Sequence, residues 1–411
     1  MHPPRLTLKS LWRLYHTAQA HLQRGETEDA ALHFSRLAAA QVRKPRNAEL
    51  APTDDRNPLV ARARLGLCYC YVEQGCLDQA LDEVNRVLEL EPTNVEALCE
   101  LSYILEIRGR RMDARTALET AVHHHPESAQ AHKALGYLLL QEDELEEAIA
   151  ACRKAVQCDP AYHPAHMELA LALGRAGRYT EAVKSMARAV QLAPGNADYY
   201  YSLSALLREA RRFDEAVRIL EKGLRVEPTH RMLLETAAEL MLEAGEPDRA
   251  IYYAQRLLRA NVKSLAARDV LGVAYLQQGR VNEALRMADQ MVTLSPLDAS
   301  HHFKKAVLFQ QQGMLREAVG EFTRVTDLSP ESEMADEARQ AIETIDNHAI
   351  RQIVLLASED LVFRAKLRRD AVDAARERGF FLSDMGFSAL QSLDFDGLSA
   401  CEPSSRPICY H

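Results

Sequence analysis

Three consecutive histidines, His123, His124 and His125, are the first residues of this sequence that suggest metal chemistry, because imidazole is the commonest protein ligand for transition metals. Successive side chains of a helix point in different directions, so three neighbours cannot converge on one ion. Histidines at the end of a helix can instead contact its exposed carbonyl groups. We therefore predict a helix-end role for them and no metal site.

Cysteine chemistry is equally poorly supported. Cys68, Cys70 and Cys76 lie close together, but their spacing matches no usual zinc-binding pattern. The eight cysteines of the chain are unevenly spaced and do not form the disulfide framework of a small secreted domain. We expect most of them to be reduced thiols, with Cys68 and Cys152 in the core.

Motifs that signal catalysis are missing from the sequence. It has no glycine-rich phosphate loop, no nucleophile elbow and no helix with paired histidine ligands. We therefore predict that the protein is not an enzyme and needs no cofactor.

Composition and charge limit the class of partner. The 411 residues carry a formal net charge of −9 with acidic and basic residues interspersed, which argues against a nucleic-acid-binding surface. No uncharged apolar run approaches the roughly 18 residues that a membrane-spanning helix needs. Polar residues interrupt the apolar runs of residues 1–22, so no signal peptide is expected there. We expect a cytoplasmic protein, of undetermined oligomeric state, that binds neither nucleic acid nor membrane.

A period of 34 residues organises most of the chain. Eight prolines fall on one grid with that spacing, and Val262 occupies the single vacant grid point. Proline cannot continue a helix, so each of these residues marks the end of one structural unit. The prolines are Pro58, Pro92, Pro126, Pro160, Pro194, Pro228, Pro296 and Pro330.

Eight units without insertion or deletion follow when Ala61 is taken as position 1 and the array extends to residue 332. Position 15 is glycine in six units, where the first helix needs a residue of positive φ to stop and reverse, and Asp143 and Arg211 are the exceptions. Position 8 is always small and position 20 is always alanine, which predicts a close helix crossing. The position-20 residues are Ala80, Ala114, Ala148, Ala182, Ala216, Ala250, Ala284 and Ala318.

A 34-residue unit with these features resembles the tetratricopeptide repeat. The resemblance implies an all-α, right-handed superhelical solenoid of antiparallel helix pairs, whose concave groove binds protein or peptide partners. Two features depart from the family: position 4, often tryptophan there, varies, and Lys305 breaks the leucine column at position 7. The lysine and asparagine clamp with which chaperone-binding members grip a C-terminal carboxylate is also missing, because positions 6 and 9 of the early units hold tyrosine, glutamate, glycine and alanine.

Shorter segments flank the array. An apolar pattern around Gly25 indicates an early degenerate repeat, and the proline and polar residues after it indicate a linker. A single apolar stripe after residue 332 indicates a cap. The predicted segments are 1–44, a degenerate repeat-like helical hairpin; 45–60, a polar linker; 61–332, the eight repeats; 333–347, a capping helix; 348–394, a small helical module; and 395–411, a disordered tail.

The C-terminal module carries a second pattern, which includes Phe363-Arg364, Leu367, Asp370, Gly379-Phe380 and Leu382-Ser383. It resembles the nitrile-hydratase-like leader domains of ribosomally made, modified peptides. The resemblance implies that the serines and cysteines of residues 395–411 occupy the place of a modified core peptide. The alternative is an extended helical cap followed by a disordered tail.

The groove has a predicted chemistry. By resemblance to the family, positions 2, 5, 9, 12 and 13 of the first helices line it. Position 9 is tyrosine in three successive units, and acidic residues follow further along, so we expect apolar or aromatic partner side chains toward the N-terminal units and basic ones near the sixth and seventh. The predicted partner-binding residues are Leu65, Tyr69, Cys99, Tyr103, Lys133, Tyr137, Met167, Tyr201, Glu235, Glu239, Asp269 and Phe303.

Both groove features have a simpler interpretation. Tyr69, Tyr103 and Tyr137 can pack between units and form local hydrogen bonds, and the acidic residues can belong to an ordinary solvated helix face. Our hypothesis is a non-enzymatic scaffold that binds a peptide segment of a partner and so assembles or regulates a complex. The alternative function is that of a precursor or maturation protein in ribosomal peptide modification.

Overall fold

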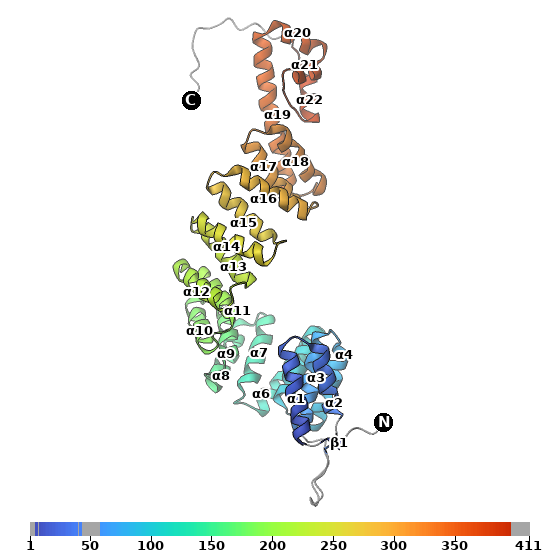
Figure 1. The fold of residues 1–411 in the computed structure, drawn as a ribbon, viewed down its shortest axis with the longest axis vertical. Coiled ribbons are helices and arrows are strands. Elements are labelled where there is room, and N and C mark those ends of the chain that lie inside the picture. The colour runs from blue at the N-terminus through green and yellow to red at the C-terminus, as the bar shows by residue number, and fades with distance from the viewer. Residues whose placement is uncertain (1–4, 7, 40, 43–57, 396–411) are drawn as a thin grey trace, which may run out of the picture. The chain divides into compact units, whose positions relative to one another are not determined.

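The computed structural model describes residues 5–6, 8–39, 41–42 and 58–395. These residues are almost entirely helical and fall into two compact units, residues 1–226 and 227–411. Figure 1 shows the helices α1 to α22 in chain order. Within the described ranges, the strand pairing is limited to β1 (Arg5–Leu6) and β2 (Gln41–Val42), which run parallel. The predicted all-α class is confirmed.

The first unit is built from helix pairs. Apart from the first three helices, its helices have 13 residues when they open a pair and 14 when they close it. Its helices are α1 (Leu8–Gln23), α2 (Thr27–Ala38), α3 (Pro58–Glu73), α4 (Leu77–Leu90), α5 (Val95–Ile107), α6 (Arg111–His124), α7 (Ala129–Gln141), α8 (Leu145–Cys158), α9 (His163–Arg175), α10 (Tyr179–Leu192), α11 (Ala197–Glu209) and α12 (Phe213–Val226).

The second unit continues the same pattern for three pairs and then departs from it. Its pairs keep the 34-residue spacing up to a long helix that starts on the grid at Glu333. Its helices are α13 (Arg231–Glu243), α14 (Pro247–Ala260), α15 (Leu265–Gln277), α16 (Val281–Leu294), α17 (Ala299–Gln311), α18 (Leu315–Leu328), α19 (Glu333–Glu359), α20 (Leu361–Arg369), α21 (Ala371–Glu377) and α22 (Asp384–Gln391).

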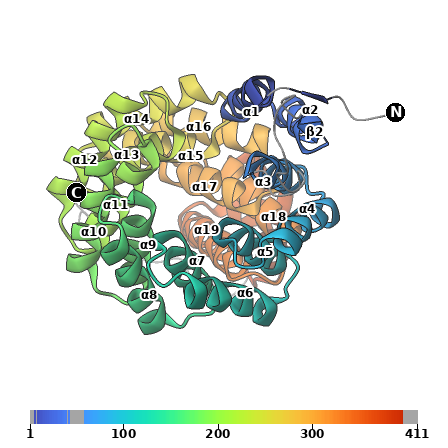
Figure 2. The same cartoon turned by 90° about the horizontal axis from the view of Figure 1, so that it is seen from below.

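The two helices of each pair have different surroundings. In the first unit, the opening helices α5, α7 and α9 lie on the inner side of the curve and α6, α8 and α10 on the outer side (Figure 2). Successive pairs pack on one another, and α7 packs on both α5 and α9. Side chains of three successive opening helices therefore share one inner surface.

The small columns make the close helix crossing that the sequence predicts. The position-20 alanines are all buried, with Ala148 and Ala182 fully inaccessible. At position 8, a Cβ added to Gly136 would lie 2.4 Å from the Sγ atom of Cys152 on the paired helix. Cys68 and Cys152 are themselves buried, as expected. A larger side chain in either column would force the helices apart.

Position 4 has a shared role that the variable sequence conceals. In five repeats its side chain donates a hydrogen bond to the main-chain carbonyl at position 32 of the preceding repeat, over distances from 2.7 to 3.1 Å. Buried donors need such partners, so the departure from tryptophan preserves a link between repeats. The pairs are His132 with Pro126, His166 with Pro160, Tyr200 with Pro194, Arg268 with Val262, and His302 with Pro296.

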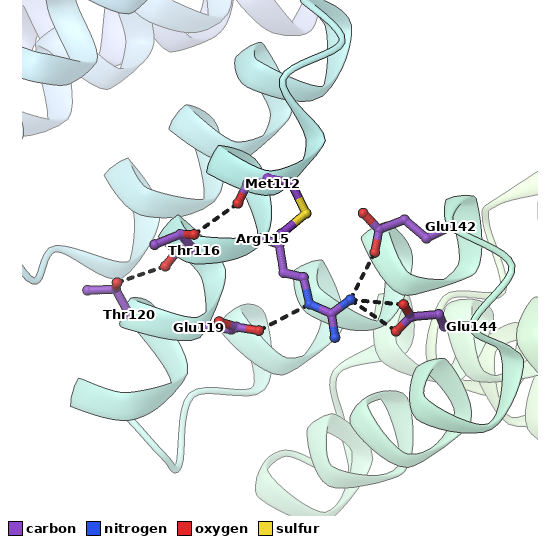
Figure 3. Close-up of polar contacts among 7 residues, drawn as sticks. All are labelled: Met112, Arg115, Thr116, Glu119, Thr120, Glu142 and Glu144. Carbon is purple, nitrogen blue, oxygen red and sulfur yellow. Dashed lines mark hydrogen bonds and ion pairs between the residues drawn. The ribbon is translucent and has the colours of Figure 1, made fainter.

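The turns within the pairs require positive φ, including where glycine is absent. Asp143 and Arg211 have φ of 64° and 59°, close to the 71–76° of the glycines in the repeat turns. Residues on either side of Asp143 are held by Arg115 of the preceding repeat, which binds Glu144 at 3.0 Å and Glu142 at 3.3 Å (Figure 3). These ion pairs anchor a strained backbone that glycine would adopt at no steric cost.

Lys305 breaks the leucine column without leaving an unpaired charge. Its ammonium lies 2.8 Å from Glu321 and 2.9 Å from Asp289, while Glu321 also contacts His302 Nδ1 at 2.6 Å. A partly buried ion network therefore replaces apolar packing in this repeat. Such a network tolerates burial because each charge has an opposite partner.

A buried carboxylate on α19 binds the segment that leads into α22. Asp346 of α19 is 5% exposed and accepts hydrogen bonds from the Ser383 N–H, at 2.8 Å, and from the Ser383 hydroxyl. Ser383 also caps α22 by accepting a hydrogen bond from the Gly386 N–H at 3.1 Å. A Cβ at Gly386 would lie 2.4 Å from the Asp346 carboxyl carbon, so glycine is needed there.

The observed helices shift several of the predicted boundaries. Helix α19 runs without interruption through the predicted border between residues 333–347 and 348–394, because its apolar stripe continues through Ile353 and Ala357. Pro58, placed in the linker, begins α3, and Phe395, placed in the tail, is buried in the C-terminal core. The rest of the tail and residues 45–57 of the linker lie outside the described residues.

Candidate functional site

A pocket of about 430 Å³ lies among the opening helices of the first unit. Its lining comes chiefly from α3, α5, α7 and α9, so three successive repeat interfaces contribute to it. The predicted groove residues that line it are Tyr69, Cys99, Tyr103, Lys133 and Tyr137.

The tyrosines of this pocket are available for contact. Tyr69 is 47% exposed and Tyr103 is 45% exposed, while Tyr137 is half-buried. Their hydroxyl groups form no hydrogen bond with any described residue, which does not fit the simpler interpretation that they are packed and locally bonded. Burial, with neighbouring acidic groups, raises the pKa of Tyr69 and Tyr137, so both hydroxyls remain protonated donors near neutral pH.

Four carboxylates also line the pocket, and the predicted residue set contains none of them. Glu73 is exposed, Glu100 and Glu106 are half-buried, and Glu168 is 5% exposed. Among the described residues that line the pocket, Lys133 on α7 is the only basic one. The pocket therefore has an excess of negative groups.

Glu168 is the most unusual of these groups. Its Oε2 atom is buried and accepts no hydrogen bond from the described residues. Burial raises the pKa of Glu168, and the charge of Lys133 opposes that rise. A buried acceptor without a partner is unfavourable by about 1–3 kcal/mol, so its presence requires a reason.

Two further carboxyl groups have shifted pKa values. Burial raises the pKa of Glu100, and the negative charge of Glu96 adds to the rise while Lys133 opposes it. Burial also raises the pKa of Glu106. Both shifts mean that the surroundings disfavour the charged form, which a cation placed in the pocket would reverse.

The sequence contained a signal for these carboxylates. Glu73 and Glu106 occupy positions 13 and 12 of their repeats, which the family resemblance already assigned to the groove. Glu100 and Glu168 both occupy position 6. The family resemblance associates this position with the carboxylate clamp and not with the residues that line the groove. The N-terminal end of the groove is therefore acidic as well as aromatic, in contrast to the expectation of apolar partner side chains.

The other predicted groove residues are more scattered. Leu65 is 6% exposed and belongs to the core, so it cannot contact a partner. Met167 and Tyr201 are half-buried and lie outside this pocket's lining.

In the second unit, Asp269 and Phe303 line a separate pocket of about 270 Å³ between α15 and α17. Asp269 is paired with Lys304 there. Glu235 and Glu239 of α13 are half-buried, and Glu235 lies 4.0 Å from Arg231.

Nucleophilic and metal chemistry have little support in the described residues. Burial raises the pKa of Cys99, in the pocket, to about 12 and that of Cys152 to about 12, so neither is a reactive thiolate. One group, His21, Glu26 and Asp29, brings potential ligand atoms within 4.8 Å of one another, but its histidine already contacts Glu26 at 2.6 Å. It lies on the first hairpin, away from the pocket lining.

Comparison with known families identifies the class of protein. Family models described as tetratricopeptide repeat match residues 15–95, 105–163, 235–299 and 270–333, and another with the same description matches residues 173–240. These matches cover more than half of the chain. The chain therefore belongs to the tetratricopeptide repeat family, as its 34-residue period predicted.

Solved structures with similar folds are distant. The crystal structure of the APC/C hetero-tetramer Cut9–Hcn1 matches with 20% identity and a TM-score of 0.42, over 77% of this chain and 63% of that one. Pseudomonas aeruginosa pilF matches with 19% identity and a TM-score of 0.43, over 51% and 95%. YrrB, described as a TPR protein with an unusual peptide-binding site, matches with 20% identity and a TM-score of 0.33, over 55% and 98%. The chain thus spans less than two thirds of the first of these structures.

Other comparisons bear on the remaining expectations. No curated protein matches the sequence. The family matches end at residue 333, and nothing found supports the resemblance of residues 348–394 to nitrile-hydratase-like leader domains. None of the described helices combines the length and the hydropathy that a membrane span requires.

Proposed function

We propose that this protein is a non-enzymatic interaction scaffold that binds a peptide segment of a partner along the opening helices of its repeats, and thereby assembles or regulates a complex. Membership of the tetratricopeptide repeat family supports a scaffold role, since the fold presents a long surface of regularly spaced side chains. The observation that carries the proposal is the pocket between α3 and α9.

The pocket suits a segment of chain better than a small substrate. Its walls come from four successive repeats, and the hydroxyl groups of Tyr69, Tyr103 and Tyr137 form no hydrogen bond with the described residues. Tyrosine gives large contact areas with little loss of side-chain entropy, and it is enriched in interfaces. The thiol of Cys99 in the pocket lining is not activated for catalysis, because burial raises its pKa, and this agrees with a binding role.

We further infer a cytoplasmic location. The described cysteines, which include buried, half-buried and exposed residues, are all unpaired, as is usual in a reducing compartment. The tight attachment of α22 to α19 through Asp346 favours a capping role for the C-terminal helices over a separable leader.

Affinity purification from the source organism's cytosol tests the proposal. The full chain is compared with the Tyr69→Ala/Tyr103→Ala/Tyr137→Ala variant, after both have been shown to have the same helicity and melting temperature. A matched control replaces Tyr252, which is 56% exposed on the closing helix α14, with alanine. Partners lost only from the triple variant support the proposal, whereas partners retained by it contradict a role for this pocket.

A further inference from the structure

The first-unit pocket has an electrostatic character that restricts what its partner can place there. Carboxylates approach from three helices: Glu73 on α3, Glu100 and Glu106 on α5, and Glu168 on α9. Lys133 on α7 contributes a positive charge to the same lining. None of these five groups forms an ion pair within 4.0 Å with any described residue, so their charges are not neutralised by fixed partners.

Groups behind the lining do not remove this imbalance. Glu96 lies close enough to Glu100 to raise its pKa, and Glu142 acts in the same way on Glu106, while Arg111 opposes it. Glu142 is itself held by Arg115. The surrounding groups that face the pocket therefore add at least as much negative as positive charge.

Glu168 identifies where a ligand group is missing. It is 5% exposed, it lines the pocket, and its Oε2 atom has no hydrogen-bond donor among the described residues. A donor supplied from outside would satisfy it. A charged donor would form the strongest bond, because charge-assisted hydrogen bonds gain most in a site of low dielectric.

The aromatic groups agree with a cationic ligand. Tyr69 and Tyr103 expose nearly half of their surfaces beside the carboxylates, and Tyr137 and Tyr162 complete the wall. Tyrosine ring faces attract ammonium and guanidinium groups by about 0.5–2 kcal/mol, depending on how far the cation is desolvated. An aromatic wall with an acidic floor group is therefore selective for an organic cation.

Ligands of other kinds fit less well. An anion would meet four carboxylates and a single lysine, which is unfavourable. An apolar side chain would remove water from Glu168 without supplying a donor. A metal ion needs converging ligands, and no three of these carboxylates bring oxygen atoms within 4.8 Å of one another in the described structure.

We propose that this pocket binds a lysine or arginine side chain presented by the partner segment, with Glu168 accepting a hydrogen bond from the cation, Glu100 and Glu106 contributing charge, and the tyrosines packing against its alkyl stem. The inference rests on the proposed function, because it requires a peptide in the groove. It places the basic residue of the partner at the second to fourth repeats, whereas the sequence predicts basic partner residues near the sixth and seventh.

The experiment is a selection from a phage-displayed library of random dodecapeptides, with the full chain as bait. Wild type, Glu168→Gln and Glu147→Gln are selected in parallel. Glu147 is the matched control because it is an exposed glutamate on the outer helix α8, outside the pocket lining. We expect wild type and Glu147→Gln to enrich lysine or arginine at one fixed peptide position, and Glu168→Gln to lose that enrichment.

The most enriched peptide is then synthesised with a fluorescent label, together with a version carrying citrulline or norleucine in place of its basic residue. We expect the neutral version to bind wild type at least about tenfold more weakly, and the difference to shrink to about threefold or less in Glu168→Gln. Glu100→Gln provides a second variant in case Glu168→Gln alters folding, which circular dichroism and melting would reveal.

The outcomes separate this inference from the proposed function. Peptides that bind wild type without a fixed basic residue, or whose basic residue is insensitive to both glutamine variants, would overturn the inference and leave peptide binding intact. If agmatine displaces the probe as effectively as the peptide itself, the site recognises a small cation and not a partner segment. If no peptide binds above background, the proposed function and the inference both fail.

Discussion

The pocket between α3 and α9 and the pocket lined by α15, α16 and α17 share several repeat positions, among them 5, 9 and 12, but differ in chemistry. The first contains four carboxylates, one lysine and exposed tyrosines. The second is lined mainly by apolar side chains such as Val273, Met291 and Phe303, and its Asp269 is paired with Lys304. The repeat thus determines where the side chains lie, and the residue types at a few repeat positions determine what the pocket can bind.

This contrast also appears in one glutamate of each unit. Glu168 in the first unit has an acceptor atom without a partner among the described residues, whereas Glu321 in the second is held by Lys305 and His302. Charges that are paired internally stabilise the fold and offer little to a ligand. Charges that are left unpaired cost stability and are available for binding.

The shared framework predicts that the same packing change costs both units alike. Ala148→Leu and Ala284→Leu, both at position 20 and at most 1% exposed, should each lower the free energy of unfolding by about 3 kcal/mol, because the helices cannot separate to admit the larger side chain. Urea unfolding followed by circular dichroism measures the loss. The control is Ala150→Leu on the exposed face of α8, which should change stability by less than about 0.5 kcal/mol. A cost confined to one unit would show that the two units do not share this crossing.

The second-unit ion network should be important for stability. Lys305→Met leaves Glu321 and Asp289 without their shared cation and should cost about 2 kcal/mol. The neighbouring Lys304→Met removes a more exposed lysine and should cost less than about 1 kcal/mol. Equal losses for the two lysines in thermal unfolding would contradict the distinction between a structural and a surface charge.

Glu168 and Glu321 should respond to pH in opposite directions. The folded-state pKa of Glu168 is raised above 4.5, so its favourable contribution is present below that value and is lost as pH rises through the folded-state pKa. The pKa of Glu321 is lowered despite burial, because His302 and Lys305 hold its charge, so its contribution is present above 4.5 and is lost as pH falls.

These signs lead to a test with matched variants. At pH 7, Glu168→Gln should be more stable than wild type and Glu321→Gln less stable. Both differences should become smaller toward pH 4. Unfolding midpoints measured in urea across this range give the comparison, and parallel pH profiles for the two variants would refute it.

The turns offer the smallest expected effect. Both repeat turns without glycine, at Asp143 and Arg211, belong to the first unit, whereas the second unit has Gly245, Gly279 and Gly313. Asp143→Gly should raise the free energy of unfolding by about 0.5 kcal/mol, and Gly279→Asp should lower it by about 1 kcal/mol. If Asp143→Gly is destabilising instead, the contacts of that side chain with Arg175 outweigh the backbone strain.

Much of the fold could be predicted because packing repeats along the chain. Position 20 is alanine wherever two helices cross closely, so one column reveals the crossing in every repeat. The same column logic identified Tyr69, Tyr103 and Tyr137, which share position 9 and do line the pocket.

The remaining features depend on contacts that do not repeat. Glu168 is buried because neighbouring helices cover it. Other repeats have Gly66 or Ala134 at the same position, so the repeat pattern does not indicate a buried carboxylate there. The contact between Asp346 and Ser383 joins segments outside the 34-residue period, so no spacing pattern indicated it or the continuity of α19. The role of position 4 could not be predicted for a different reason. Its residues differ in shape and hydropathy and have in common only that they donate a hydrogen bond.

The central claim is that the acidic, tyrosine-lined pocket of the first unit is the place where a partner segment binds. Hydrogen–deuterium exchange of the full chain, with and without the selected basic peptide, tests it most directly. The account predicts slower exchange in α5, α7 and α9, with α15 and α17 unchanged, and loss of this protection in Glu168→Gln. Protection of α15 and α17 instead, or equal protection in the variant, would contradict the account.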